Sequence, residues 1–126
     1  MDLRTTFTIG APFSANNMYV PSAKFGMVKS KKYKKWIEIN LENIKHNDKI
    51  ANFPVDIEIC VFGGRGFGKK ADVDNIIKPI GDLLVKANII PDDNHNFIRR
   101  YDVRFMDFWH QIGESTTVIT IIQPEI

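Results

Sequence analysis

The 126-residue chain has a single cysteine, Cys60, so it cannot form an internal disulfide bond. Cys60 stands in an apolar run, which predicts a buried, inert thiol and agrees with a reducing cytoplasm. No stretch approaches the ~20 consecutive apolar residues of a membrane span, and the first six residues lack the apolar core of a signal peptide. We therefore expect a cytoplasmic protein with no membrane partner.

The chain also lacks internal repeats, low-complexity tracts and any linker long enough to divide it. Hydrophobic residues make up 44% and charged residues 25% of the sequence, which is typical of a soluble globular protein. The length predicts one domain, residues 1–126, with one hydrophobic core. Because the net charge is only +2, the positions of the charges carry more information than their sum.

Four segments have the composition of β-strands: residues 3–9, 55–62, 97–109 and 116–123. Helices are predicted over residues 30–46, with Ser30 as the N-cap, and over residues 76–88. Residues 10–27 contain Gly, Pro, Ser and Asn, which predicts a long loop. The order β-α-β-α-β-β predicts an α/β (α+β) fold, a mixed sheet with two main helices packed on it.

An acidic motif precedes the second predicted helix. Its sequence is Asp72-Val73-Asp74-Asn75-Ile76-Ile77-Lys78, and Asp92-Asp93 follows the helix. Helical periodicity places Asp74, Lys78 and Asp82 on one side and the apolar side chains on the other. Converging carboxylates beside one ammonium are what a protein needs to hold Mg²⁺ against a phosphodiester. Spacing alone does not prove that Asp93 returns to this place.

Other interpretations of these carboxylates compete with a metal site. Asp74 could simply cap the helix, with Lys78 and Asp82 as an exposed i,i+4 pair. An EF-hand beginning at Asp72 would need a ligand and then a glycine where Ile76 and Ile77 stand. Nucleotide-sugar transferases also use an Asp-x-Asp motif but usually have a larger nucleotide-binding domain. The Gly-rich segment 63–70 lacks P-loop spacing, and the histidines show no paired metal-ligand spacing.

Basic residues cluster on both sides of the acidic motif in the sequence. Candidate DNA-binding residues are Lys31, Lys32, Lys35, Arg65, Lys69, Lys70, Arg99 and Arg100. For any single lysine, a solvated surface is the simpler explanation. Together, cations around a metal-binding acidic site suit a polyanion whose phosphate approaches the carboxylates. Phe25, Tyr33 and Phe67 stand among these cations and could stack on unpaired bases, although core packing explains Tyr33 at least as well.

The combined pattern resembles the RusA-type Holliday junction resolvase family. The resemblance runs through Asp72-x-Asp74-Asn75-x-x-Lys78, then Asp82 within the helix, then Ile90-Pro91-Asp92-Asp93; Pro12 to Tyr19 is similar to the family's early loop. It implies Asp72, Asp74 and Asp93 as catalytic carboxylates that bind Mg²⁺, or Mn²⁺ in its place, and Lys78 as a catalytic lysine. It also implies a homodimer that nicks two opposed strands of a four-way junction.

Several points stay open at this level. Pro79, directly after Lys78, is unusual inside a helix, and Asp92 could replace Asp93 as the metal ligand. Asp82 is expected to hold the Lys78 ammonium in place. The rival functions are a non-catalytic protein that binds branched DNA, and a small nuclease with another branched or single-stranded substrate.

Overall fold

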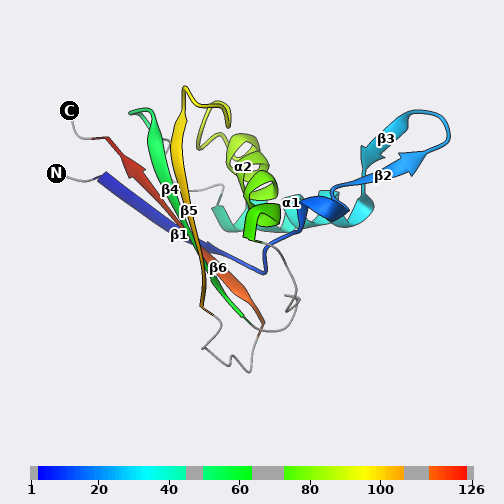
Figure 1. Cartoon of the computed structure of the whole chain (residues 1–126), viewed down its shortest axis with the longest axis horizontal. Coiled ribbons are helices and arrows are strands. Elements are labelled where there is room, and N and C mark those ends of the chain that lie inside the picture. Colours follow the sequence, from blue (N-terminus) through cyan, green and yellow to red (C-terminus); the bar gives the residue numbers. More distant parts are fainter. Residues whose placement is uncertain (1–2, 45–49, 64–72, 107–113, 125–126) are drawn as a thin grey trace.

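The computed structural model describes residues 3–44, 50–63, 73–106 and 114–124. Within them, a four-stranded sheet carries two helices on one face, and a two-stranded hairpin extends away from this body (Figure 1). The mixed α+β architecture expected from the sequence is therefore confirmed.

The main sheet has the strand order β1-β6-β4-β5. Its strands are β1 (Leu3–Ile9), β6 (Thr116–Gln123), β4 (Val55–Phe62) and β5 (Ile98–Met106). The β4–β5 pair is parallel and the other pairs are antiparallel, so the sheet is mixed as predicted. The predicted bounds of β1, β4 and β6 are confirmed. The β5 strand begins one residue later than predicted, and residues 107–109 of that prediction lie outside the described residues.

The alternation of β4 decides which face of the sheet is covered. Ile57 and Ile59 are buried against the helices, whereas Asp56, Glu58 and Cys60 lie on the other face. The expectation that Cys60 is buried is therefore wrong: the thiol is free and only half-buried. Successive side chains of a strand point to opposite faces of the sheet. Cys60 points to the face of β4 that the helices do not cover.

Helix α1 (Lys31–Ile44) begins where the sequence predicts. The Ser30 hydroxyl accepts the Tyr33 N–H at 3.1 Å, which confirms Ser30 as the N-cap. Tyr33, Ile37 and Ile44 bury the predicted apolar stripe. The last two residues of the predicted helix lie outside the described residues. Neither described α-helix is long and apolar enough to cross a membrane.

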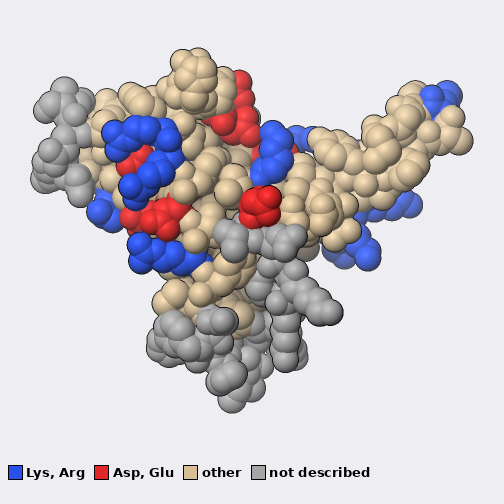
Figure 2. All heavy atoms as spheres, in the orientation of Figure 1, with Lys and Arg blue, Asp and Glu red and all other residues tan. Residues whose placement is uncertain are grey.

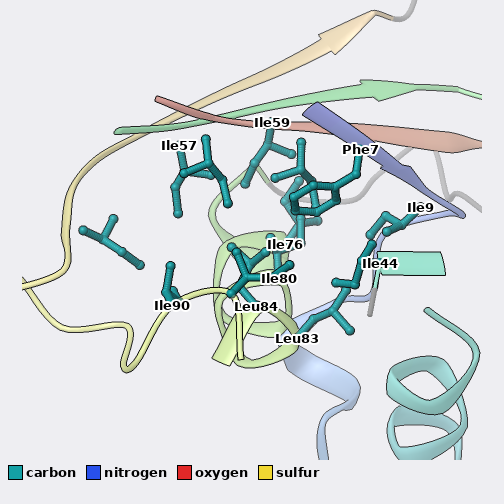
Figure 3. Close-up of a cluster of buried hydrophobic side chains, with 14 of the residues drawn as sticks. Phe7, Ile9, Ile44, Ile57, Ile59, Ile76, Ile80, Leu83, Leu84 and Ile90 are labelled. Atoms are coloured by element: carbon teal, nitrogen blue, oxygen red, sulfur yellow. The ribbon is translucent and has the colours of Figure 1, made fainter. Parts of the chain in front are cut away.

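Helix α2 (Ile77–Lys86) follows a short 3₁₀ helix, η2 (Val73–Ile76), and packs Ile80, Leu83 and Leu84 under the sheet (Figure 3). Pro79 is the third residue of α2. It stands in the first turn, where a backbone N–H has no partner within the helix, so the missing donor costs little. This position accounts for a proline that is unusual in a helical sequence.

The predicted loop over residues 10–27 is partly wrong. It contains a 3₁₀ helix, η1 (Ala15–Asn17), and the strands β2 (Tyr19–Ser22) and β3 (Gly26–Lys29), which pair antiparallel. Each of these strands is only four residues long, and β2 contains Pro21. Because turn-forming residues flank such short strands, the sequence pattern favoured a loop. The element order is accordingly β-β-β-α-β-α-β-β.

Candidate functional site

The centre of the candidate site is the Lys78 ammonium. Its Nζ lies 3.0 Å from Oδ2 of Asp93 and 3.2 Å from Oδ1 of Asp82. Asp82 comes from the next turn of α2, whereas Asp93 comes from the segment that follows the helix. The structure therefore returns Asp93 to Lys78, a step that spacing alone could not establish.

The end of α2 explains how the chain returns. Asn88 has a φ of 59°, and the N–H groups of Asn88 and Ile89 bond to the carbonyls of Val85 and Leu84 at 3.0 Å each. These are the two hydrogen bonds of a Schellman motif, which ends a helix and reverses the chain. Ile89 and Ile90 are then buried, which anchors the following turn against the core.

The two adjacent aspartates of this turn have different partners. Asp92 accepts the Asp93 N–H at Oδ1 (2.8 Å) and the Asn94 side-chain amide at Oδ2 (3.0 Å). Both oxygens of Asp92 thus shape the turn, while the carboxylate of Asp93 faces Lys78. Asp93 is the one of the two that contacts Lys78, although Asp92 also lines the hollow beside this ammonium.

A tyrosine from α1 reaches the same cluster. The Tyr33 hydroxyl donates a hydrogen bond to Oδ2 of Asp82 at 2.8 Å, so Asp82 bridges Tyr33 and Lys78 through its two oxygens. Burial, together with the hydrogen bond to Asp82 and its negative charge, raises the pKa of Tyr33 far above its ordinary value. Tyr33 therefore stays protonated and is a fixed donor to Asp82 at all physiological pH values.

Close packing under α2 also shapes the site. A Cβ on Gly81 would lie 3.0 Å from the Tyr101 hydroxyl and 3.3 Å from Oδ2 of Asp93. Gly81 thus lets the helix approach both side chains. Burial, and then the charges of Asp93 and Asp82, raise the pKa of Tyr101. The sequence reasoning missed Gly81 and Tyr101 as site residues; only the isolated glycine in a helical pattern signalled a close approach. The suggestion that Tyr33 stacks on unpaired bases is wrong, because its side chain is fully buried.

The electrostatics favour a charged Lys78. The hydrogen bond that Lys78 donates to Asp93 is the largest cause of a raised Lys78 pKa, and burial opposes it. The Lys78 side chain is 56% exposed, and exposed ion pairs contribute about 0–1 kcal/mol to stability. Fold stability is thus a weak explanation for this arrangement of one cation and two carboxylates.

Of the two remaining predicted carboxylates, Asp72 and Asp74, the structure describes only Asp74. Asp74 is exposed within η2, whereas Asp72 lies outside the described residues. The N-cap of α2 is Ile76, with no side-chain cap, so Asp74 is not the cap of α2. The Lys78–Asp82 i,i+4 pair of that simpler interpretation is present. In the described part of the chain, no three Asp, Glu, His or Cys residues form a group that could hold a metal ion.

A hollow of about 350 Å³ opens beside Lys78. Its wall includes both carboxylates of the cluster and also Tyr19 and Lys29, from the base of the hairpin. Acidic and basic side chains lie side by side over α2 (Figure 2). A phosphate group entering the hollow would meet Lys78 together with lysines from the hairpin and from α2.

The predicted DNA-binding residues separate into three groups. Lys31, Lys32 and Lys35 are exposed on α1. Arg99 pairs with Asp56 through two hydrogen bonds of 2.9 and 2.7 Å, and Arg100 lies 3.8 Å from Asp102. These arginines already face carboxylates, so their charge is less available to a polyanion than that of the α1 lysines. Arg65, Lys69 and Lys70 lie outside the described residues.

No protein-family model matches the chain, and no curated protein matches it. The function must therefore be argued from the site itself.

Proposed function

We propose that the protein is a structure-selective endodeoxyribonuclease that hydrolyses phosphodiester bonds of four-way DNA junctions. The single observation that carries this proposal is the contact of Lys78 with Asp93 and Asp82. It joins two segments of the RusA-like sequence pattern at one ammonium, beside a hollow that opens to solvent. The pattern and the geometry thus agree on Lys78, Asp82 and Asp93.

The donor chemistry fits a hard divalent cation. Mg²⁺ commonly takes one or two protein carboxylates and fills its other positions with water and phosphate oxygens. Asp74 and Asp93 supply carboxylates of this kind, and Asp72 is the third proposed ligand. Mn²⁺ accepts the same oxygen ligands. When bound, the ion would polarise the scissile phosphate and lower the pKa of a water molecule.

The chain's own residues have separate roles in this proposal. Lys78 neutralises negative charge that grows on the phosphate oxygens in the transition state. Asp82 fixes the direction of Lys78, and Tyr33 fixes Asp82 from the neighbouring helix. Asp93 has lone pairs enough to serve both the ammonium and a cation, because an ionised carboxylate accepts at two oxygens. Tyr101 and the surrounding packing limit how far Asp93 can move.

The proposed assembly is a homodimer acting on DNA in the cytoplasm. Two copies related by a two-fold axis present two equivalent sites, which suits a junction of similar symmetry. The exposed lysines of α1 would supply salt-dependent affinity for the backbone.

A labelled four-way junction incubated with Mg²⁺ tests the proposal. We expect paired nicks in opposed strands from the unmodified protein. Asp74→Asn should abolish nicking while a gel shift shows nearly unchanged binding, because no basic residue is altered. Glu38→Gln, which removes the same charge from an exposed position of α1, is the matched control and should cleave normally. If Asp74→Asn loses binding and cleavage together, Asp74 is structural.

The same experiment separates the rival functions. A shifted but intact junction in Mg²⁺ would identify a non-catalytic protein that binds branched DNA. Comparing junctions, forks, flaps, single strands and plain duplex at equal salt would identify a nuclease with another substrate. Asp92→Asn and Asp93→Asn, assayed side by side, show which of the two aspartates the reaction needs.

A further inference from the structure

The β2–β3 hairpin is an arm that leaves the body of the protein (Figure 1). In the described residues, six large hydrophobic side chains are exposed, and four of them lie on this arm: Tyr19, Val20, Phe25 and Met27. Phe25 is 72% and Met27 62% exposed. Single exposed apolar residues are ordinary, but a cluster on one projecting element indicates a binding surface.

The tip of the arm is an ordered turn that presents Phe25 to solvent. The Ser22 hydroxyl accepts the backbone N–H groups of Lys24 and Phe25 at 3.4 and 3.3 Å. Gly26 follows with a φ of 71°, a conformation that favours glycine. The Lys24 ammonium lies 5.4 Å from the centre of the Phe25 ring. The turn thus holds an aromatic face and a cation together at the far end of the hairpin.

The segment that forms the arm and the start of α1 carries charge of one sign. Residues 3–37 contain no Asp or Glu, whereas six lysines fall between Lys24 and Lys35. Basic side chains are visible at the far end of the arm and beneath it (Figure 2). A partner that is both anionic and rich in flat apolar surfaces matches this combination. Unpaired nucleotides have these two properties in each repeating unit.

The base of the arm is part of the candidate site. Tyr19 and Lys29 are cross-strand partners in the hairpin, and both line the hollow that contains Lys78 and Asp93. A strand with its phosphate in this hollow would pass directly onto the arm. At about 3.3 Å per residue, the four-residue strands and the turn reach roughly 13 Å beyond the hollow. That length corresponds to about four nucleotides, at 3.4 Å each along a stacked strand.

We propose that the hairpin is a stacking arm: Phe25 packs against an unpaired base about four nucleotides from the phosphate held beside Lys78. This inference rests on the proposed function and names the feature of the substrate that the arm recognises. Single-stranded segments offer such a base, and so does a branch point at which base pairs open, whereas continuous duplex does not. The arm would therefore favour branched DNA over duplex.

Photo-crosslinking tests the proposal directly. Thymines at successive positions from the branch point are replaced by 5-iodouracil, and the wild-type protein is irradiated with the junction in EDTA. We expect a crosslink that mass spectrometry assigns to Phe25, and no such crosslink on matched duplex. Phe25→Ala should weaken junction binding roughly 5- to 150-fold, the range for removal of one base–aromatic stack. Its salt dependence should not change, because every cation that faces a phosphate is kept.

Two further variants separate stacking from other roles of an exposed residue. Phe25→Trp should retain the crosslink and the affinity, whereas Phe25→Leu, which keeps apolar surface without an aromatic face, should lose both. Ile39→Ala removes another exposed apolar side chain, on α1, and should bind like the wild type. Equal unfolding midpoints for all variants would exclude a folding defect.

The outcomes also distinguish this inference from the proposed function. Junction nicking by a wild-type protein that gives no Phe25 crosslink would overturn the stacking arm alone. A Phe25 crosslink without nicking in Mg²⁺ would support the arm and remove the enzyme. If Phe25→Ala instead converts a dimer into a monomer in light scattering, the arm is a contact between copies and the proposal is wrong. Failure of the wild type to bind junctions would overturn both.

Discussion

The Tyr33 hydroxyl donates a hydrogen bond to Asp82 across 49 residues of sequence and thereby joins α1 to α2 at the candidate site. Asp82 holds Lys78 with its other oxygen. A change in α1 can therefore reach Lys78 through two short contacts, without touching the substrate.

Tyr33→Phe tests this connection. We expect the unfolding free energy to fall by about 1.5–3 kcal/mol, because a partly buried hydrogen bond to a charged group is removed. Cleavage should slow through kcat, with KM nearly unchanged, because only the direction of Lys78 is affected. Steady-state kinetics and urea unfolding measure these effects. An unchanged kcat in a folded variant would show that Tyr33 does not position Lys78.

The same tyrosine predicts a pH dependence of stability. Because its folded pKa is raised, Tyr33 contributes stability fully below its unfolded pKa of about 10, and this contribution is lost as the pH rises above that value. Wild-type stability should therefore decline above pH ~10, and Tyr33→Phe should show a weaker decline. Urea unfolding at several alkaline pH values measures the difference between the two slopes.

Asp93→Asn should lower the pKa of Lys78, since the hydrogen bond that Lys78 donates to the Asp93 carboxylate is the largest cause of its elevation. NMR titration of the lysine side-chain resonances measures this without any substrate. Asp92→Asn is the neighbouring control, because Asp92 bonds within its own turn. Equal Lys78 pKa values in Asp93→Asn and wild type would contradict the observed contact.

Gly81→Ala sets two effects against each other. Alanine inside a helix is favoured over glycine by about 1 kcal/mol, but the added Cβ would press on Tyr101 and Asp93. We expect an unfolding free energy within about 1 kcal/mol of wild type, while cleavage falls roughly tenfold because Asp93 is displaced. Calorimetry and a cleavage time course would show this separation. Full activity would mean that Asp93 tolerates displacement.

The exposed lysines of α1 and the carboxylate-paired arginines of β5 should differ in their contribution to DNA binding. Replacing Lys31, Lys32 and Lys35 by Ala should reduce the salt dependence of junction affinity by about 0.9 units of log–log slope for each phosphate that these lysines neutralise in the wild type. Arg99→Ala should change this slope little, because Asp56 already pairs with the guanidinium. Binding isotherms at several salt concentrations give the slopes. A larger change for Arg99→Ala would reverse this assignment.

Arg99→Ala should instead affect stability in acid. The hydrogen bond from Arg99 lowers the pKa of Asp56. The resulting stabilisation is present above the unfolded pKa of about 4 and disappears as the pH falls through the folded pKa. The stability difference between wild type and Arg99→Ala should therefore shrink below pH ~4, which urea unfolding at neutral and acidic pH can measure.

Sequence patterns predicted the elements that bury a regular face. The bounds of β1, β4 and β6 followed from their composition and, in β4, from alternation, and the start of α1 followed from Ser30. The hairpin was missed because its exposed strands bury no face and therefore leave no periodic signal. A segment was therefore predicted correctly where its own side chains alternate or repeat with a buried face, and missed where they do not.

The site depended on contacts between distant residues. Helical spacing predicted the charged side of α2, which carries Lys78 and Asp82. The return of Asp93 required the chain reversal at Asn88, and the hydrogen bond of Tyr33 required the packing of two helices. Spacing within one element predicts neither. Asp72, Arg65, Lys69 and Lys70 remain sequence predictions.

Ser30 does more than begin a helix. Its backbone N–H bonds to the Met18 carbonyl at 2.8 Å, its hydroxyl donates to the Asn17 carbonyl at 2.6 Å, and the same oxygen caps Tyr33. Ser30 thus ties the start of α1 to the residues that precede the hairpin. Enlarging or removing its side chain would disturb both the base of the arm and the position of Tyr33, so the proposed selection of branched DNA and the proposed cleavage would decline together.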